Sequence, residues 1–243
     1  MLAGSVASMT VLGAPDLVLL TLSELAEQVR RISRAAAIPL MVDADHGYGN
    51  ALNVFRTVEE LEVAGASAIT IEDTLLPAPF GGDDKGLIPV EEGVGKMRAA
   101  VAARSDPNLV IVARTSSASL VNVEDAVARG KAYEMAGADA VFFAGIKNRE
   151  QLHALGALSR PILLGAVPPA LSDNGLLAAH GVRVCLQGHR PFQAAVRAAY
   201  ETLKRLSEGA MPAEITEIAS DELMARVTRR EAYAVQAKDF LGG

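Results

Sequence analysis

Two aspartates at the end of a short apolar run are the first residues of this chain that could carry chemistry. Residues 39–42 are followed by Asp43-Ala44-Asp45-His46-Gly47-Tyr48-Gly49-Asn50. Strand side chains alternate between two faces, so Asp43 and Asp45 are expected to face the same way. Their carboxylates repel each other unless a cation or a proton lies between them. The pattern predicts either an oxygen-lined site for Mg2+ or a pair of caps for the following helix.

Polar side chains also end three further apolar runs. These runs end at Glu72, at Arg114 and shortly before His189. An arginine beside a metal site can hold a substrate carboxylate in a two-pronged contact, and it can also neutralise a neighbouring acidic residue. A histidine at such a position can bind substrate, move a proton or donate an orienting hydrogen bond. Together the four strand ends predict one catalytic site.

Short strands and longer amphipathic helices alternate along the chain and must position these side chains. Three segments, residues 62–71, 134–143 and 178–186, each consist of a helix end, a glycine and an apolar strand. The glycine supplies the left-handed conformation that ends a helix and returns the chain to the sheet. Further strands are expected at residues 39–45, 109–115 and 161–166, and helices at residues 22–37, 90–103, 123–135 and 191–206.

This alternation is the pattern of parallel βαβ units. A barrel is favoured over an open dinucleotide-binding sheet because no strand leads into a G-x-G-x-x-G helix entry. Six strands are complete, and residues 2–9 are expected to be the tail of a seventh, whereas a closed barrel has eight. The sequence therefore predicts a TIM-type (β/α)8 barrel over residues 1–208 that lacks its first strand and helix, and a C-terminal helical extension over residues 209–243. Either the start of the barrel is missing, with Met1 a misplaced start, or the barrel is incomplete.

Composition limits the classes of function. The chain has 243 residues and a formal net charge of −6, and its basic residues are scattered, which argues against a nucleic-acid-binding surface. Its one cysteine, Cys185, cannot form an internal disulfide, so a reducing compartment is expected. No apolar stretch reaches the roughly 18 residues of a membrane span, and the N-terminus lacks the pattern of a signal peptide. We expect a cytoplasmic protein with no membrane partner.

A long connection lies beside the expected site. Residues 74–87 contain the glycine-rich stretch Gly81-Gly82-Asp83-Asp84-Lys85-Gly86. Such a loop can close over substrate and exclude water. It is equally compatible with an idle surface loop.

Several of these segments resemble the isocitrate lyase/phosphoenolpyruvate mutase superfamily. The resemblance runs from Gly4 to beyond Leu206 and is carried by Gly4-Ser5-Val6-Ala7-Ser8, Ala14-Pro15-Asp16, Asp43-Ala44-Asp45-His46-Gly47-Tyr48-Gly49, Ile71-Glu72-Asp73 and Ala113-Arg114-Thr115. D-x-D-x-G-Y-G followed by I-E-D at this spacing is far more specific than either motif alone. Within the superfamily, residues 71–77 and 187–189 are most similar to the bacterial oxaloacetate decarboxylase branch.

The resemblance implies an enzyme, a carbon–carbon lyase that depends on Mg2+, with Mn2+ as an alternative. Its substrate would be oxaloacetate or a close 2-oxo diacid, converted to pyruvate and CO2 through a metal-stabilised enolate. At matched positions, Asp43 would contact Mg2+ directly, while Asp45 and Glu72 would reach it largely through water. Ser5 would hold one substrate carboxylate, Arg114 would clamp the other, and His189 would face the reacting carbons.

The resemblance also implies a homotetramer, a dimer of dimers whose partners exchange their last helix. Residues 221–241 are the candidate for that helix, and docking on their own barrel is the alternative.

Two departures from the family pattern bear on the substrate. Lyases of the superfamily carry K-[KR]-C-G-H on the mobile loop, and this chain has no cysteine there, which disfavours isocitrate or methylisocitrate cleavage. The decarboxylase branch carries a tyrosine after the strand that ends near Leu164, where this chain reads Gly165-Ala166-Val167-Pro168-Pro169. Two alternatives follow: lyase chemistry of the methylisocitrate type or phosphonopyruvate-type P–C chemistry, and a truncated barrel that only binds metal or a dicarboxylate.

Overall fold

The computed structural model describes residues 1–35, 37–81 and 86–242. The chain divides into two compact units, Met1–His189 and Arg190–Gly243, and each is described by itself. The domain boundary expected after residue 208 stays a prediction.

Six parallel strands form the sheet of the first unit. In chain order and in sheet order they are β1 (Met41–Asp43), β2 (Ala68–Glu72), β3 (Val110–Thr115), β4 (Ala140–Phe143), β5 (Ile162–Leu164) and β6 (Val182–Cys185). Each strand pairs with the next one along the chain, so every connection is a crossover that carries a helix. The described residues thus form a half-barrel of the TIM type, with six of the eight strands that a closed barrel has.

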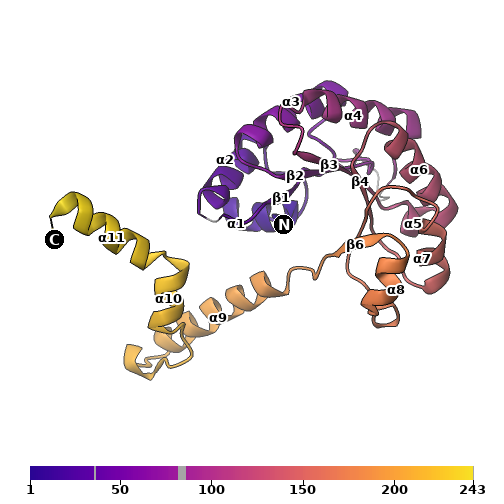
Figure 1. Cartoon of the computed structure of the whole chain (residues 1–243). Coiled ribbons are helices and arrows are strands. Elements are labelled where there is room, and N and C mark those ends of the chain that lie inside the picture. The colour runs from indigo at the N-terminus through magenta and orange to yellow at the C-terminus, as the bar shows by residue number, and fades with distance from the viewer. Residues whose placement is uncertain (36, 82–85, 243) are drawn as a thin grey trace. The chain divides into compact units, whose positions relative to one another are not determined.

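The helices of this unit line the outer side of the curved sheet (Figure 1). They are α1 (Gly4–Val11), α2 (Leu22–Ser33), α3 (Ala51–Val63), α4 (Val90–Ala103), α5 (Ser117–Leu120), α6 (Val123–Met135), α7 (Arg149–Leu155) and α8 (Asn174–Ala179), with a 3-10 turn at Pro169–Leu171. The expected bounds of α4 and α6 are confirmed. So are the three glycine helix ends, because Gly65, Gly137 and Gly181 have φ angles of +99°, +104° and +81°.

Apolar side chains fill both faces of the sheet. Every second strand residue packs between the sheet and the helices, as do Val42, Ile69, Ile111 and Phe143. The opposite face carries a smaller buried cluster of Val112, Ala140, Phe142 and Leu163, against which Met41 and Leu186 pack. A sheet that is apolar on both faces is the normal state of parallel strands.

The segment 2–9 is not a strand, contrary to expectation. Only Leu2 joins the sheet, as an isolated parallel bridge to Val42, and helix α1 begins at Gly4. The buried residues of α1 are Gly4, Ala7 and Ser8, a helical i, i+3, i+4 spacing. A short run of small residues fits both periodicities, and this explains the error.

The expected helix 191–206 is one residue longer at each end, as α9 (Arg190–Ser207), and two other expected helices differ more. Helix α2 ends at Ser33 rather than residue 37, and residue 36 lies outside the described residues. The segment 221–241 forms two helices, α10 (Asp221–Val227) and α11 (Arg230–Leu241), in place of the expected single helix. The break falls at Arg229, whose φ of +55° is left-handed and cannot continue a helix.

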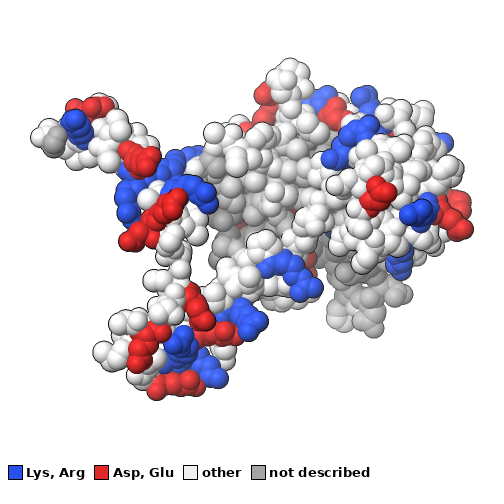
Figure 2. All heavy atoms as spheres, turned by 60° about the horizontal axis from the view of Figure 1, so that its bottom comes forward, with Lys and Arg blue, Asp and Glu red and all other residues white. Residues whose placement is uncertain are grey.

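The second unit consists of α9 (Arg190–Ser207), a 3-10 turn at Pro212–Glu214, and helices α10 and α11. None of its described residues is buried, and its exposed apolar side chains include Val196, Tyr200 and Leu203 on α9. In Figure 2, positive and negative side chains lie interspersed on the visible face. Throughout the described chain, every helix is too short or too polar to cross a bilayer.

Candidate functional site

The carboxyl ends of β1, β2 and β3 bring three predicted site residues into contact. Arg114 lies directly opposite Glu72 in the register of β2 and β3. Its Nη1 donates to Asp43 Oδ2 at 2.7 Å, and its Nε lies 3.1 Å from Glu72 Oε2. Arg114 Nε has no hydrogen-bond partner among the described residues, so its contact with Glu72 is an ion pair only. Arg114 therefore forms an ion pair with each of the two acidic residues.

The contacts around this ion-pair cluster fix its orientation. Thr70 is fully buried, lies opposite Asp43 in the register of β1 and β2, and donates its hydroxyl to Asp43 Oδ1 at 2.9 Å. The guanidinium of Arg114 stacks over the ring of Phe142 at 5.3 Å. Asp43 and Glu72 are themselves only 7% and 6% exposed. The site is thus built on an apolar inner face of the sheet and holds its charged groups largely out of water.

Asp45 lies just past β1, in a left-handed conformation with φ of +46°. Its backbone carbonyl accepts a hydrogen bond from the Glu72 amide at 2.8 Å, which ties the two predicted metal ligands together. Its carboxylate lies against Gly4, where a β-carbon would come within 2.7 Å of Oδ1. Only glycine fits at the first position of α1 without pushing the Asp45 carboxylate away.

The turn that carries Asp45 is held by residues that sequence reasoning missed. Gly47, Tyr48 and Gly49 also have positive φ angles. Thr57 donates to the Gly47 carbonyl at 3.1 Å, and the ammonium of Lys96 donates to the His46 carbonyl at 3.0 Å. Lys96 is only 3% exposed.

A signal for Lys96 exists in the sequence. In α4 it shares the i, i+3, i+4, i+7 spacing of the buried residues Gly93, Met97 and Ala100. A lysine on the apolar face of a helix needs a polar partner, and the periodicity could have pointed to it.

Ser5 and His189 form a second contact. Ser5 Oγ lies 3.2 Å from His189 Nε2, although 184 positions separate them along the chain. His189 is exposed, and Ser5 follows Gly4, which lies against Asp45. The structure therefore brings five of the six predicted residues together in two clusters, Asp43 with Glu72 and Arg114, and Ser5 with His189. The sixth, Asp45, lies against Gly4 and accepts from the Glu72 amide through its backbone carbonyl.

The expected closing loop is described only at its two ends. Thr74 and Leu87 form an antiparallel bridge, and the Leu75 amide donates to the Gly86 carbonyl at 2.8 Å. The glycine-rich stretch includes residues 82–85, which lie outside the described residues.

The electrostatics of the cluster favour a cation. Burial, followed by the negative charges of Asp43 and Glu72, raises the pKa of Asp45 to about 8. Burial also raises the pKa of Glu72, against the opposing charge of Arg114. The carboxyl groups of Asp43, Asp45 and Glu72 thus cannot all ionise easily with Arg114 as their one cation, and a bound metal ion would remove that obstacle.

The carboxyl oxygens of the site fit a Mg2+ ion that keeps several of its waters. Within the described ranges, no three acidic, histidine or cysteine side chains gather closely enough to enclose a metal by themselves. Mg2+ does not need such a cage, because it keeps several waters and is usually held by one or two carboxylates together with substrate oxygens. Asp43, Asp45 and Glu72 offer oxygen ligands of that kind.

The raised pKa of Asp45 predicts that metal binding weakens as the pH falls. An aspartate with its ordinary pKa of 3.8 is ionised in the unfolded chain, whereas folded Asp45 keeps its proton up to about pH 8. Folding without metal thus takes up a proton, and stability should fall as the pH rises through this window. A cation must displace the proton, so Mg2+ affinity should drop roughly tenfold for each pH unit below this pKa.

Calorimetric titration with Mg2+ between about pH 6 and pH 8, repeated in buffers of different ionisation enthalpy, measures both the affinity and the proton release. An affinity that stays constant over this range, without proton release, would contradict the assignment of Asp45 to the metal site.

Comparison with known proteins connects this geometry to a family. The family model for phosphoenolpyruvate phosphomutase matches residues 1–207. An oxaloacetate decarboxylase of Rhodopseudomonas palustris is 54% identical over 243 residues, which are 100% of this chain and 84% of that protein.

Solved structures agree with the family match. The phosphoenolpyruvate phosphomutase of Streptomyces platensis subsp. rosaceus has a TM-score of 0.85 and 28% identity, over 98% of this chain and 86% of that one. A phosphonopyruvate hydrolase in complex with oxalate and Mg2+ has a TM-score of 0.83 and 31% identity over the same shares. The predicted resemblance is confirmed, and the chain belongs to the phosphoenolpyruvate phosphomutase family, within the PEP mutase/isocitrate lyase superfamily.

Proposed function

We propose that this protein is a Mg2+-dependent carbon–carbon lyase that decarboxylates oxaloacetate, or a close 2-oxo diacid, to pyruvate and CO2. The observation that carries the proposal is the cluster in which Arg114 faces Asp43 and Glu72 beside the proton-retaining Asp45. The cluster combines carboxyl groups that can bind a cation with a guanidinium that can bind a substrate carboxylate. Relatives that are 51–55% identical over the whole chain bear the name oxaloacetate decarboxylase.

In this proposal Asp43 would hold the metal directly, and Asp45 and Glu72 would hold it largely through water. Bound Mg2+ supplies a Lewis acid for the negative charge that develops on the 2-oxo oxygen as CO2 leaves. Asp45 must release its proton before it can serve, because its pKa is raised to about 8. Mn2+ also suits an oxygen donor set.

The remaining residues orient the diacid. A guanidinium has five N–H donors, so Arg114 can contact Asp43 and Glu72 and still hold a substrate carboxylate. Ser5 holds the other carboxylate. The bond that breaks joins C3 to the departing carboxylate, and the electron pair stays on the pyruvate enolate. His189, within 3.2 Å of Ser5 Oγ, is the candidate to deliver the proton to carbon.

Phosphonopyruvate chemistry is the second candidate. The relative crystallised with oxalate and Mg2+ is a phosphonopyruvate hydrolase and is 31% identical to this chain. Phosphonopyruvate and oxaloacetate share the 2-oxo acid that the same metal and arginine would hold. They differ in the leaving group, CO2 or a phosphoryl group.

A product screen separates these reactions. Purified protein is incubated with oxaloacetate, phosphonopyruvate or 2-methylisocitrate, with Mg2+ or with chelator, and the metal's own decarboxylation of oxaloacetate is subtracted. We expect Mg2+-dependent pyruvate release from oxaloacetate, with kcat/KM at least about 100-fold above either alternative. Phosphate release that outpaces CO2 release would instead establish P–C bond chemistry.

The finer features of the fold and assembly are part of the same proposal. We infer a cytoplasmic location and a homotetramer, a dimer of dimers in which partners exchange the C-terminal helical segment. The support is that α9, α10 and α11 expose apolar side chains such as Tyr200, Leu203 and Phe240, which a partner subunit would cover. Sedimentation velocity measures the oligomer directly.

A further inference from the structure

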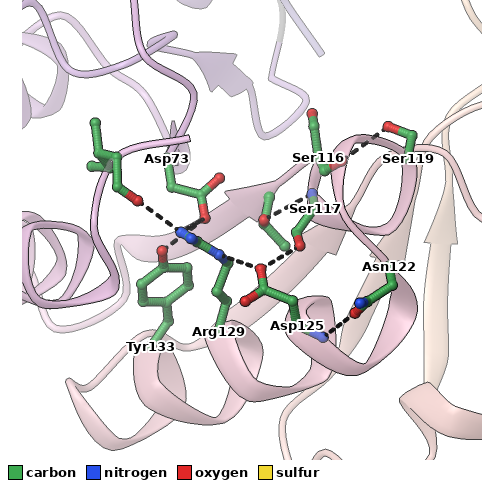
Figure 3. Close-up of polar contacts among 10 residues, drawn as sticks. Asp73, Ser116, Ser117, Ser119, Asn122, Asp125, Arg129 and Tyr133 are labelled. Carbon is green, nitrogen blue, oxygen red and sulfur yellow. Dashed lines mark hydrogen bonds and ion pairs between the residues drawn. The ribbon is translucent and has the colours of Figure 1, made fainter. Parts of the chain in front are cut away.

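A buried polar network joins α6 to the chain at the ends of β2 and β3 (Figure 3). Its centre is Arg129 on α6, which is 8% exposed. Arg129 Nη1 donates to Asp73 Oδ2 at 3.1 Å and to the Ile88 carbonyl at 3.0 Å, and Nε donates to Asp125 Oδ2 at 2.7 Å. Tyr133 also donates to Asp73 Oδ2, at 2.7 Å.

One arm of this network holds the residue that follows Glu72. Asp73 donates its amide to the Arg114 carbonyl at 3.2 Å and accepts from the Ile88 amide at 2.9 Å. Its side chain is held through one oxygen, because Asp73 Oδ1 is buried and has no hydrogen-bond partner among the described residues. Arg129 thus holds both Asp73, at the end of β2, and Ile88, just before α4.

The other arm reaches the residues that follow Arg114. Asp125 Oδ2, which accepts from Arg129, also accepts from the Ser117 hydroxyl at 2.5 Å. The Ser117 amide donates in turn to Thr115 Oγ1 at 3.2 Å. Thr115 is the last residue of β3 and the neighbour of Arg114.

We propose that Arg129 is a positioning residue for the active site, which sets the spacing of Glu72 and Arg114 by holding the chain directly after each of them. This inference rests on the metal site of the proposed function, and on the proposed reaction only where catalysis is measured. Arg129 touches none of the predicted site residues, so its effect must pass through Asp73 and through Ser117 with Thr115.

The sequence makes room for this network. A β-carbon on Gly93 of α4 would come within 2.5 Å of the Tyr133 hydroxyl, so glycine at this position lets the hydroxyl reach Asp73. Burial, followed by the charge of Asp73, raises the pKa of Tyr133, which keeps its hydroxyl protonated and able to donate. Burying an arginine, two carboxylates and a tyrosine costs free energy unless every group is paired. Proteins often keep such a network where it orients the ligands of a metal.

The test compares Arg129→Gln with a matched variant at the other end of the sheet. Arg104 is also a partly buried arginine that joins an aspartate, Asp139 at 2.6 Å, and a backbone carbonyl, that of Leu109 at 3.0 Å. It lies at the amino ends of β3 and β4, away from the site. Arg104→Gln therefore removes a similar set of contacts without touching the strand ends that carry Glu72 and Arg114.

The main readout is binding of Mn2+ to the full chain, measured by electron paramagnetic resonance of the free ion, beside the melting temperature and kcat and KM for oxaloacetate. We expect both variants to melt at lower temperature. Only Arg129→Gln should weaken Mn2+ binding, by about 10- to 100-fold, with a matching loss of kcat. Arg129→Lys, which keeps the charge, should recover part of the affinity.

Equal Mn2+ affinity in Arg129→Gln, Arg104→Gln and the unaltered protein would overturn the proposal and leave Arg129 a purely structural residue. Should Arg129→Gln not fold, Tyr133→Phe takes its place, with an expected weakening of about threefold for one lost hydrogen bond. Unchanged affinity in that variant would also overturn it. An unaltered protein that binds Mn2+ but does not decarboxylate oxaloacetate refutes the proposed function alone, and one that binds no Mn2+ refutes both.

Discussion

Asp43→Ala is expected to lower Mg2+-dependent pyruvate release from oxaloacetate by at least about 10^3-fold. Asp43 is the buried candidate metal ligand on β1, and it contacts both Arg114 and Thr70. Its removal takes away the proposed direct ligand and also frees Arg114 to pair with Glu72 alone. Initial rates at saturating Mg2+, with the metal's background subtracted, measure the loss.

Asp139→Ala is the matched control for this variant. Asp139 is also an aspartate bound to an arginine, at 2.6 Å, but it precedes β4 at the opposite end of the sheet. We expect Asp139→Ala to lose stability and to keep kcat within about threefold of the unaltered protein. Pyruvate release in Asp43→Ala that stays within tenfold of the unaltered protein would refute the direct metal contact.

Arg114→Met is expected to lower both the stability and the activity of the protein, and Mg2+ should restore only the stability. Without metal, the substitution leaves Asp43 and Glu72 buried without their cation, which should lower the free energy of unfolding by about 3–5 kcal/mol. Added Mg2+ should restore part of this loss, because the metal neutralises the same carboxylates. Catalysis should not return, since the group that clamps the substrate carboxylate is gone, and kcat/KM should fall by about 10^3-fold.

Urea unfolding with and without Mg2+ measures the first effect, and steady-state kinetics measures the second. Arg104→Met is the control, because it removes a comparable ion pair, with Asp139, that Mg2+ has no reason to replace. A stability loss in Arg114→Met that is equal with and without Mg2+ would show that the metal does not sit among these carboxylates.

The geometry of a parallel sheet explains why sequence reasoning found the central cluster. Residues that end consecutive strands meet at one edge, so Asp43, Glu72 and Arg114 could be placed together from the strand ends alone. The alternation within each strand gave their common face, and the observed register of Glu72 opposite Arg114 agrees with it. The family resemblance added Ser5, which no periodicity indicates.

Pattern reasoning failed where a short segment fits more than one conformation. Residues 2–9 are small and apolar, and only their packing at helical spacing makes them α1. The segment 221–241 has a continuous helical composition, yet Arg229 adopts a left-handed conformation that splits it. Local helix and strand propensities predict neither of these two conformations, because propensities are weak compared with tertiary contacts.

The sequence by itself determined the alternating α/β architecture, the ends of α4 and α6, and the residue types at the mouth of the sheet. The tertiary structure alone decided which buried charges meet: Lys96 with the turn after Asp45, Ser5 with His189, and Arg129 with Asp73 across 56 positions. The physical reason is that helical and strand periodicities act over a few residues. The partner of a buried charge is chosen by whichever distant group the fold brings within hydrogen-bond reach, because an unpaired charge in the interior is too costly to keep.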